Sequence, residues 1–195
     1  MQRLKPAMLG VSLAVTANAC ASSAALDCSY LARETAGNPG HNEFQSQSRC
    51  AKLRPDGSLA VEPACLANLH FSDGVGAILV PTGWYYVTPA GRTARVLTYD
   101  NGPDYFEEGL ARTIRSGKVG FVDRSLSEVI RPAWDFAFPF AGGYAVVCNG
   151  CRSYPVSDEH SQMRDGQWGY IDRSGRVVVP VTHDRDELPP PPASR

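Results

Sequence analysis

The sequence has no excess of positive charge and no long hydrophobic run inside the chain. Its 195 residues carry 19 Lys+Arg against 20 Asp+Glu, so the basic footprint of a nucleic-acid-binding protein is missing. No segment beyond the N-terminal region reaches the roughly 18 apolar residues that indicate a membrane-spanning helix. Phosphate-loop, dinucleotide-binding and Ser-His-Asp motifs are also missing. These absences exclude nucleic acid as a partner and give no support to the enzyme classes that such motifs identify.

The composition favours a folded chain made of many short elements. Hydrophobic residues make up 43% of the chain and charged residues 20%, which is enough for a packed core. The 18 glycines and 15 prolines indicate frequent turns and short strands rather than long helices. The length is typical of one domain with a small appendage.

Residues 1–21 resemble an export signal. Arg3 and Lys5 precede an apolar segment, Met8–Ala17, which is too short to span a bilayer as a helix. Small residues then offer two Ala-x-Ala cleavage sites. Cys20 adds an alternative, because bacterial lipoprotein signals end just before a cysteine that becomes acylated. Simple cleavage, lipidation of Cys20 and an uncleaved N-terminus therefore all stay open, with simple cleavage favoured.

The region from 22 to 51 is predicted to be a small cysteine-containing segment stapled by disulfides. We expect a short helix over Asp27–Thr35, with Asp27 as its N-cap, followed by a polar loop over Gly37–Ser48. Few apolar residues surround the cysteines of this part of the chain, so covalent links would compensate for a thin core. The disulfide candidates here are Cys28, Cys50 and Cys65. At the other end, residues 185–195 are rich in proline and are predicted to be a disordered tail.

Residues 52–184 contain a repeated strand–turn–strand pattern. Its turn positions are Gly57, Gly91, Leu126 and Gly175, with intervals of 34, 35 and 49 residues. The longer last interval indicates an insert, which we place at 148–166. Four copies can be aligned, beginning at Lys52, Tyr86, Phe121 and Tyr170.

A second landmark recurs in phase with the first. Phe71, Phe106 and Phe140 each begin a Phe-x-x-Gly element that leads into a small or apolar strand. The pattern predicts half-buried hairpins with glycine turns of positive φ, and Leu126 therefore requires a different turn in its copy. A proline is predicted to close the second strand in three copies (Pro63, Pro132, Pro180). Stacked copies would bury a continuous aromatic spine made of Trp84, Tyr86, Phe106, Phe121, Trp134, Phe136, Phe140, Trp168 and Tyr170.

The best-preserved copy, Trp168-Gly169-Tyr170-Ile171-Asp172, resembles the WG repeat of bacterial proteins. Val119–Asp123 is a degenerate version, and Phe106–Ala111 fits the Phe-x-x-Gly-Leu-Ala element of the same pattern. The resemblance implies an all-β array of stacked hairpins without a shared activity. It supplies no catalytic or cofactor-binding residue, and we expect no cofactor.

The insert carries the residues best suited to chemistry. Cys148 and Cys151 form a Cys-x-x-Cys pair, and Glu159-His160 follows. In an exported protein such a pair favours a local disulfide. A zinc site using Cys148, Cys151 and His160, and a redox-active thiol pair, are the alternatives. If cleavage removes Cys20, five of the six cysteines remain, and their pairing is left open.

An acidic group formed by Asp100, Asp104, Glu107 and Glu108 could bind calcium or act as paired carboxylates. It does not match an EF-hand loop, and a solvated turn is the favoured interpretation. Asp123 and Asp172 occupy the same repeat position, so hairpin geometry explains both.

The sequence favours a noncatalytic, exported repeat protein that binds or scaffolds another protein at the bacterial envelope, in the periplasm or outside the cell. The array and the missing active-site motifs support this hypothesis. The alternative is an envelope enzyme that uses thiols or a metal at Cys148, Cys151 and His160. The partner would be a protein or an envelope component, and a lipid anchor on Cys20 is the only membrane attachment expected.

Overall fold

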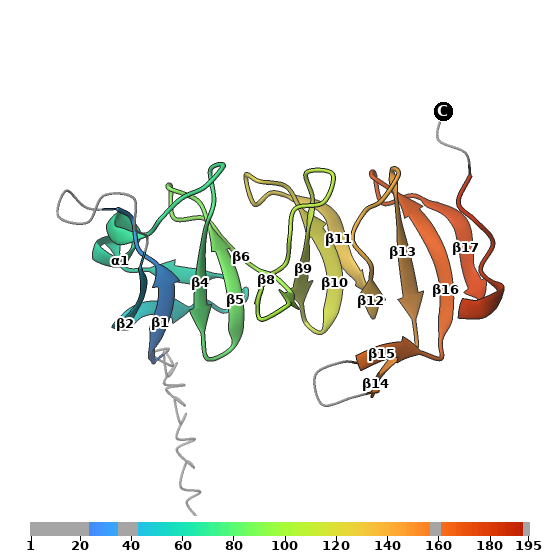
Figure 1. The fold of residues 1–195 in the computed structure, drawn as a ribbon, viewed down its shortest axis with the longest axis horizontal. Helices are drawn as coiled ribbons and strands as arrows, with labels where there is room; N and C mark the ends of the chain where they lie inside the picture. The colour runs from blue at the N-terminus through green and yellow to red at the C-terminus, as the bar shows by residue number, and fades with distance from the viewer. Residues whose placement is uncertain (1–23, 35–42, 157–160, 193–195) are drawn as a thin grey trace, which may run out of the picture.

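The chain folds into an elongated row of antiparallel β-sheets, seen side by side in Figure 1. The computed structural model describes residues 24–34, 43–156 and 161–192. The predicted signal, 1–21, and its Cys20 lie outside the described residues. No helix of the described part is both long enough and apolar enough to cross a membrane.

The first sheet has six strands in the order β3-β2-β1-β4-β5-β6. One short helix, α1 (Pro63–Asn68), follows β3 and packs Cys65 and Leu66 into the core of this sheet. The strands are β1 (Ala25–Leu31), β2 (Phe44–Leu53), β3 (Leu59–Val61), β4 (Gly76–Val80), β5 (Gly83–Val87) and β6 (Thr93–Arg95).

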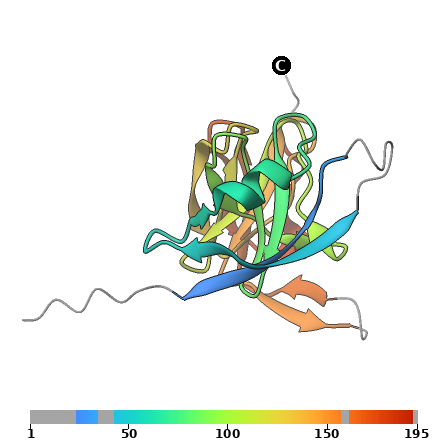
Figure 2. The same cartoon turned by 90° about the vertical axis from the view of Figure 1, so that its left-hand side faces the viewer.

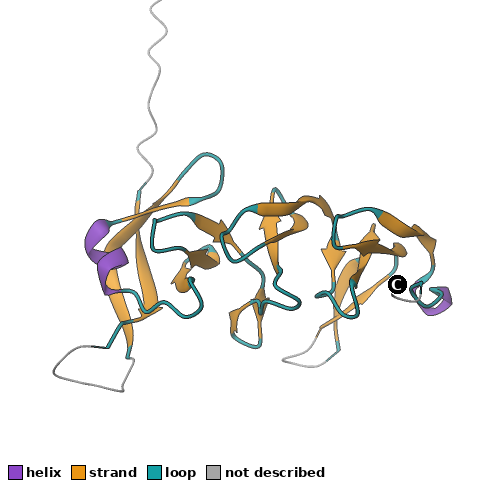
Figure 3. Cartoon of the chain, turned by 90° about the horizontal axis from the view of Figure 1, so that it is seen from above, coloured by secondary structure: helices purple, strands orange, loops and turns teal. Residues whose placement is uncertain are grey.

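Two further sheets continue the row, with orders β11-β10-β9 and β12-β13-β16-β17, and two small hairpins project from it. A 3-10 helix, η1 (Arg185–Glu187), follows the last strand. Figure 3 shows how little helix the described residues contain. The remaining strands are β7 (Thr98–Tyr99), β8 (Gly102–Pro103), β9 (Ala111–Arg115), β10 (Lys118–Val122), β11 (Glu128–Trp134), β12 (Phe136–Ala137), β13 (Tyr144–Asn149), β14 (Arg152–Pro155), β15 (Ser161–Arg164), β16 (Gln167–Asp172) and β17 (Val177–His183).

The repeated unit is a three-stranded meander rather than a hairpin. The described residues hold four of them: β1-β2-β3, β4-β5-β6, β9-β10-β11 and β13-β16-β17. Seen along the row in Figure 2, the meanders lie one behind another. The predicted all-β repeat array is thus confirmed, with an extra strand in each copy.

The first copy corrects two predictions. Residues 27–31 of the helix expected over Asp27–Thr35 belong to strand β1, and the loop expected up to Ser48 gives way to strand β2 at Phe44. The reason is visible in the burial: Cys28, Tyr30 and Ala32 alternate inward with period two, and Asp27 binds a strand amide instead of capping a helix. The boundary between the N-terminal region, ending at 51, and the repeat region, beginning at 52, stays a prediction. Strand β2 runs across it.

The Phe-x-x-Gly landmarks are tight turns that lead into the first strand of a meander, β4, β9 or β13. Glu108 and Gly109 have φ of 51° and 82°, and Gly142 and Gly143 have 62° and 84°. Two consecutive positive φ values match the twist of the flanking strands, as in type I′ turns. The glycine of the landmark is therefore a backbone requirement, shared by Gly74 at φ 84°.

The predicted exception at Leu126 is wrong. Its φ is 58°, its amide donates to the Asp123 carbonyl at 2.9 Å, and the Asp123 amide donates to the Ser127 carbonyl at 3.1 Å. The same pair of bonds closes the turn at Gly175. Leu126 adopts the left-handed conformation because its side chain, 6% exposed, is packed in the core with Val122.

Two of the three prolines do not close strands as predicted. Pro132 lies inside β11 and Pro180 inside β17, while Pro63 follows the end of β3 and begins α1. Both strands carry a bulge at the proline: Tyr170 pairs with Val179, but Trp168 pairs with His183. A bulge tolerates proline because no ladder hydrogen bond is required from it.

The aromatic residues of the predicted spine, apart from Tyr170, fall into three separate clusters instead of one continuous spine. Phe121 and Phe140 contact each other in one cluster, at 4.7 Å between ring centroids. Tyr86 and Phe106 belong to the second, and Trp168 to the third. Two of these clusters lie between successive units, one between the second and third and the other between the third and fourth, so the packing is local to each interface.

Candidate functional site

The insert forms a hairpin, β14–β15, that projects from the row of sheets (Figure 1). Nearly all of its described residues are exposed, including Tyr154 at 37% and Val156 at 54%. The hydroxyl of Tyr154 donates to Asp165 at 2.6 Å, and this carboxylate raises the pKa of Tyr154. The hairpin buries little apolar surface of its own, so its base must hold it in place.

The base of the hairpin is fixed by covalent and steric constraints. Cys148 and Cys151 form a disulfide with their Cα atoms 6.1 Å apart. The Gly150 amide donates to Asp135 at 2.7 Å, and Lys118 pairs with the same carboxylate. The Lys118 bond and then the Gly150 amide lower the pKa of Asp135. Gly166 has a φ of 68°, so the chain turns sharply back into β16.

The predicted zinc ligands are only partly placed by the structure. Cys148 is 0% exposed and Cys151 9%, and both sulfurs are used in the disulfide. His160 and the neighbouring Glu159 lie outside the described residues. A thiol that exchanges with a substrate must be reachable and must ionise easily. The burial of this pair favours a structural link, and the metal and redox alternatives stay untested.

The C-terminal segment covers the tryptophan below the hairpin. The guanidinium of Arg185 lies 4.5 Å from the Trp168 ring centroid and 4.8 Å from that of Phe138. The Trp168 indole donates to the Asp165 carbonyl at 2.8 Å, and Leu188 packs on the same cluster. Arg185 and Leu188 fall in the segment that the sequence assigned to a disordered tail. Sequence patterns did not indicate this cation–π contact.

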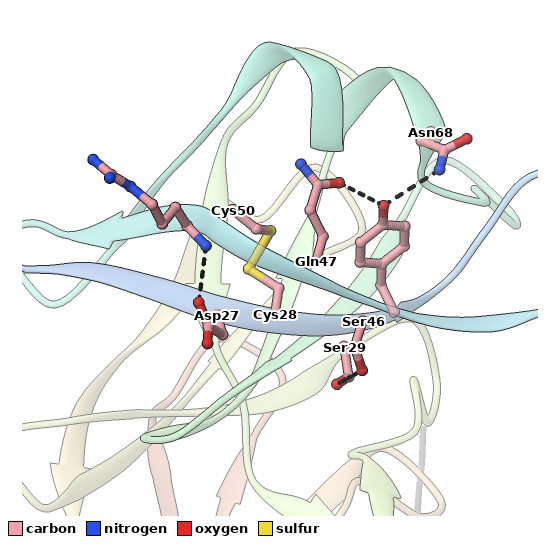
Figure 4. Close-up of a disulfide and its surroundings, with 9 residues drawn as sticks. Asp27, Cys28, Ser29, Ser46, Gln47, Cys50 and Asn68 are labelled. Atoms are coloured by element: carbon pink, nitrogen blue, oxygen red, sulfur yellow. Dashed lines mark hydrogen bonds between the residues drawn. A yellow bond between two sulfur atoms is a disulfide. The ribbon is translucent and has the colours of Figure 1, made fainter.

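A second group of functional interest is the sulfur cluster, which we define as Cys28, Cys50 and Cys65. Cys28 and Cys50 form a disulfide between β1 and β2, with Cα atoms 5.6 Å apart (Figure 4). The pairing of the two strands shifts between Leu26 and Cys28, and Arg49 takes a φ of 56° in the resulting bulge. The bulge turns Cys50 inward beside Cys28, a contact that regular alternation would not produce.

Cys65, from α1, completes the cluster without a covalent partner. Its sulfur and those of Cys28 and Cys50 all lie within 4.8 Å of one another. Burial raises the pKa of the Cys65 thiol to about 11. Burial likewise raises the pKa of Tyr30, whose hydroxyl donates to Gln47 at 2.9 Å and accepts from Asn68 at 3.3 Å (Figure 4).

Two members of the acidic group, Asp104 and Glu108, have separate partners in the structure. Asp104 is 1% exposed and forms an ion pair with the buried Arg112, whose Nε donates to it at 3.1 Å. Glu108 instead accepts from the Gly143 amide at 3.1 Å. The solvated-turn interpretation is wrong for Asp104. The sequence did contain a sign of this buried ion pair, because Arg112 stands where the other copies have Ala77 and Val146.

Asp123 and Asp172 serve the turns, as their shared position predicts. Asp172 accepts from the Ser174 hydroxyl at 2.6 Å and from the Arg176 amide at 3.1 Å. The Ser125 hydroxyl and the Ser127 amide bind Asp123 in the same way, at 2.7 and 2.9 Å. These bonds account for both carboxylates without any catalytic role.

In a comparison with protein families, residues 120–150 and 168–182 match the WG containing repeat. This chain contains WG repeats. The matched segments run from β10 through β13 and along β16 and β17, and hairpin β14–β15 lies in the gap between them. Searches of curated proteins and of solved structures found no significant match.

The structure also shows why the WG repeat requires its glycine. A Cβ on Gly169 would lie 2.5 Å from the Val179 carbonyl oxygen, and a Cβ on Gly120 would collide with the carbonyl of Ile130. In both copies the glycine faces the bulge that contains the proline. The Trp-Gly pair is thus a packing motif, and it brings no catalytic group to the chain.

Proposed function

We propose that this WG repeat protein is a noncatalytic binding or scaffolding module, exported to the cell envelope, whose partner contacts hairpin β14–β15. The observation that carries the proposal is the contrast between the exposed hairpin and its fixed base. Tyr154 and Val156 are open to solvent, yet the chain leaves and rejoins the sheet through a disulfide and a tight turn.

The fold gains little from such a hairpin. A two-stranded hairpin is marginal in water unless it buries an apolar face, and the described residues of β14 are all exposed. Fixing it nevertheless reduces the entropy lost when a partner binds, which raises affinity without any added contact area. Aromatic side chains held on a preorganised element are typical anchors of protein–protein interfaces.

Two disulfides in the described residues support export, because such bonds persist in oxidising compartments. The signal-like residues 1–21 support the same location. An enzyme built on Cys148 and Cys151 remains the second candidate, and the Cys-x-x-Cys spacing is the observation in its favour. Replacing both cysteines with serine in the folded protein should leave binding detectable if the pair is structural.

Site-specific photocrosslinking tests the binding proposal. A photoreactive amino acid would replace Tyr154 in the full-length protein, expressed in its own host. The matched control would replace Tyr99, which is 51% exposed on the other projecting hairpin, β7–β8. We expect a discrete crosslinked species from position 154 and none of that mass from position 99.

Excision of the hairpin provides the reciprocal test. A variant in which residues 152–165 are replaced by a short glycine linker should fold and lose the partner that position 154 captures. The same adduct from both probe positions, or a partner retained after excision, would contradict the assignment of the interface to this hairpin.

A further inference from the structure

The sulfur cluster has one more cysteine than its disulfide needs. Cys65 is 0% exposed and unpaired, although it lies next to a formed disulfide. A buried cysteine can serve as a small apolar side chain. Three sulfurs brought together from β1, β2 and α1, each within 4.8 Å of the others, are a more specific arrangement than packing requires.

The shape of the cluster separates two kinds of sulfur chemistry. Transfer of the disulfide to Cys65 needs its sulfur in line with the bond that breaks. A sulfur in van der Waals contact with one end of a bond of about 2 Å, and in line with it, would lie more than about 5 Å from the far end. Cys65 lies within 4.8 Å of both sulfurs, so the three form a triangle rather than a line. Thiolates held about 2.3 Å from a metal lie roughly 4 Å apart around it. The two edges from Cys65 are within that range, and the Cys28–Cys50 edge, a covalent bond here, opens on reduction.

The ligand set indicates which ion would fit. Thiolate sulfur selects soft cations, chiefly Cu(I) and Zn(II). Closed zinc sites take four ligands, whereas the described Cys, His, Asp and Glu residues supply three atoms here and no fourth. Three soft ligands in a buried site suit Cu(I) better, because Cu(I) accepts three-coordination and is protected from water there.

A groove and a polar group lie next to the cluster. The surface groove is lined by Asp27, Cys28 and Leu79, and Cys28 is the one member of the cluster in its lining. The Tyr30 hydroxyl lies beside the Cys65 thiol and is itself held by Gln47. Contacts with such neighbours commonly orient metal ligands.

We propose that the reduced sulfur cluster binds one Cu(I) ion through Cys28, Cys50 and Cys65. The disulfide and the metal are alternative states of the same site. A phosphine reductant takes the cluster from one to the other: the phosphine and one water become phosphine oxide, and Cys28 and Cys50 each gain a proton and an electron. Binding of Cu(I) then releases the thiol protons to the buffer.

The test uses the full-length chain with Cys20, Cys148 and Cys151 replaced by serine, so that the three cysteines of the cluster are the ones that remain. The protein is reduced with a phosphine without oxygen and titrated with Cu(I) against the chelator bicinchoninate. We expect one copper per chain for the reduced protein and none for the oxidised protein. Adding Cys65→Ser should weaken binding at least about tenfold.

Near-UV circular dichroism shows whether the chain that binds copper is folded. If reduction loosens the fold, Cu(I) should restore the native spectrum of the parent and not that of the Cys65→Ser variant. The proposal is overturned if the reduced protein retains no copper, if the oxidised protein binds it equally, or if Cys65→Ser keeps the parent's affinity. A separate sample of the reduced protein is loaded with Zn(II). The proposal is also overturned if one equivalent of Cu(I) fails to displace that Zn(II).

Discussion

At the scale of single residues, the glycine of each Trp-Gly or Val-Gly pair is required by the strand opposite. Gly169 faces the bulge of β17, where backbone atoms of Val179 and Pro180 leave no room for a Cβ. Gly120 meets the same obstacle from β11. The motif residue and the proline, far apart in the sequence of each copy, therefore form one packing unit.

Gly169→Ala should destabilise the protein by about 2–3 kcal/mol, because the added methyl group must push two backbone segments apart. Urea unfolding would measure the change. Gly102→Ala is the matched control, since its Cβ would have ordinary contact, 3.7 Å from the Tyr99 carbonyl oxygen. Equal stabilities of the two variants would contradict the packing account.

Cys65 should resist alkylation in the native protein. Its side chain is inaccessible, and its pKa of about 11 leaves little thiolate near neutral pH. Iodoacetamide at about pH 8 should label it only after denaturation, as read by peptide mass spectrometry. Labelling in the native protein at the rate of a free thiol would show that α1 does not shield the cluster.

At the scale of elements, four turns share one geometry although their sequences differ. Gly57, Gly91 and Gly175 supply the positive φ without a side chain, and Leu126 supplies it at a cost. That cost is about 1–2 kcal/mol, and burial of a leucine side chain contributes about as much or more. The hydrophobic contact therefore decides which residue the turn holds.

Leu126→Gly should be no less stable than Leu126→Ala, because glycine recovers the conformational strain that alanine retains. Both should lose about 2–3 kcal/mol relative to the native protein through the vacated core. Leu110, which is equally buried but has no positive φ, is the control, and there Leu→Gly should be worse than Leu→Ala. Thermal unfolding of the four variants shows whether glycine or alanine is the more stable replacement at each site. The same order of stability at both sites would contradict the argument.

The turn carboxylates predict a loss of stability in acid. The Ser125 and Ser174 hydroxyls, followed by backbone amides, hold the pKa values of Asp123 and Asp172 below the ordinary 3.8. A lowered folded pKa gives stability that is present above the unfolded value and is lost as pH falls through the folded one. Stability should therefore fall as the pH drops below about 4 and through the lowered pKa values of the folded state.

The double variant Asp123→Asn, Asp172→Asn should show a smaller fall over this range, because its amides do not titrate. Urea unfolding at successive pH values measures the difference in slope. Parallel pH profiles of the two proteins would show that other groups control acid unfolding.

At the scale of the whole molecule, successive copies are joined by polar bonds, two of them between equivalent positions. The Thr93 hydroxyl accepts from the Leu59 amide at 2.7 Å, 34 residues away, and Arg92 donates to Ser127 at 2.9 Å, 35 residues away. Arg112 links the third copy to the fourth through the Ala137 carbonyl at 3.0 Å. Neighbour contacts of this kind make stability a sum over adjacent copies.

Arg112→Met should cost about 3–5 kcal/mol, because Asp104 is left buried and unpaired. Hydrogen exchange should show lost protection in β9–β13 and little change in the six-stranded sheet, since coupling runs between neighbours. Adding Asp104→Leu should recover most of the stability, because both charges are then removed. Uniform loss of protection along the chain would instead indicate a single cooperative unit.

The sequence by itself determined the repeat, its period, the position of its turns and the insert, because turns of positive φ and alternating strands leave local patterns. It also identified the WG repeat from five consecutive residues, Trp168–Asp172. It misassigned β1, since Asp27 is as acceptable beside a strand as at a helix N-cap. Only the tertiary structure decided how copies pair, because that depends on contacts between distant segments.

The same division applies to the sites. Cys148 and Cys151 were recognisable as a pair from their spacing, whereas Asp104 with Arg112 and Arg185 with Trp168 meet only when strands pack. The sulfur cluster is the clearest case. Its cysteines could be counted in the sequence, but the bulge at Arg49 and the position of α1 bring the three sulfurs together, and neither follows from local sequence preference.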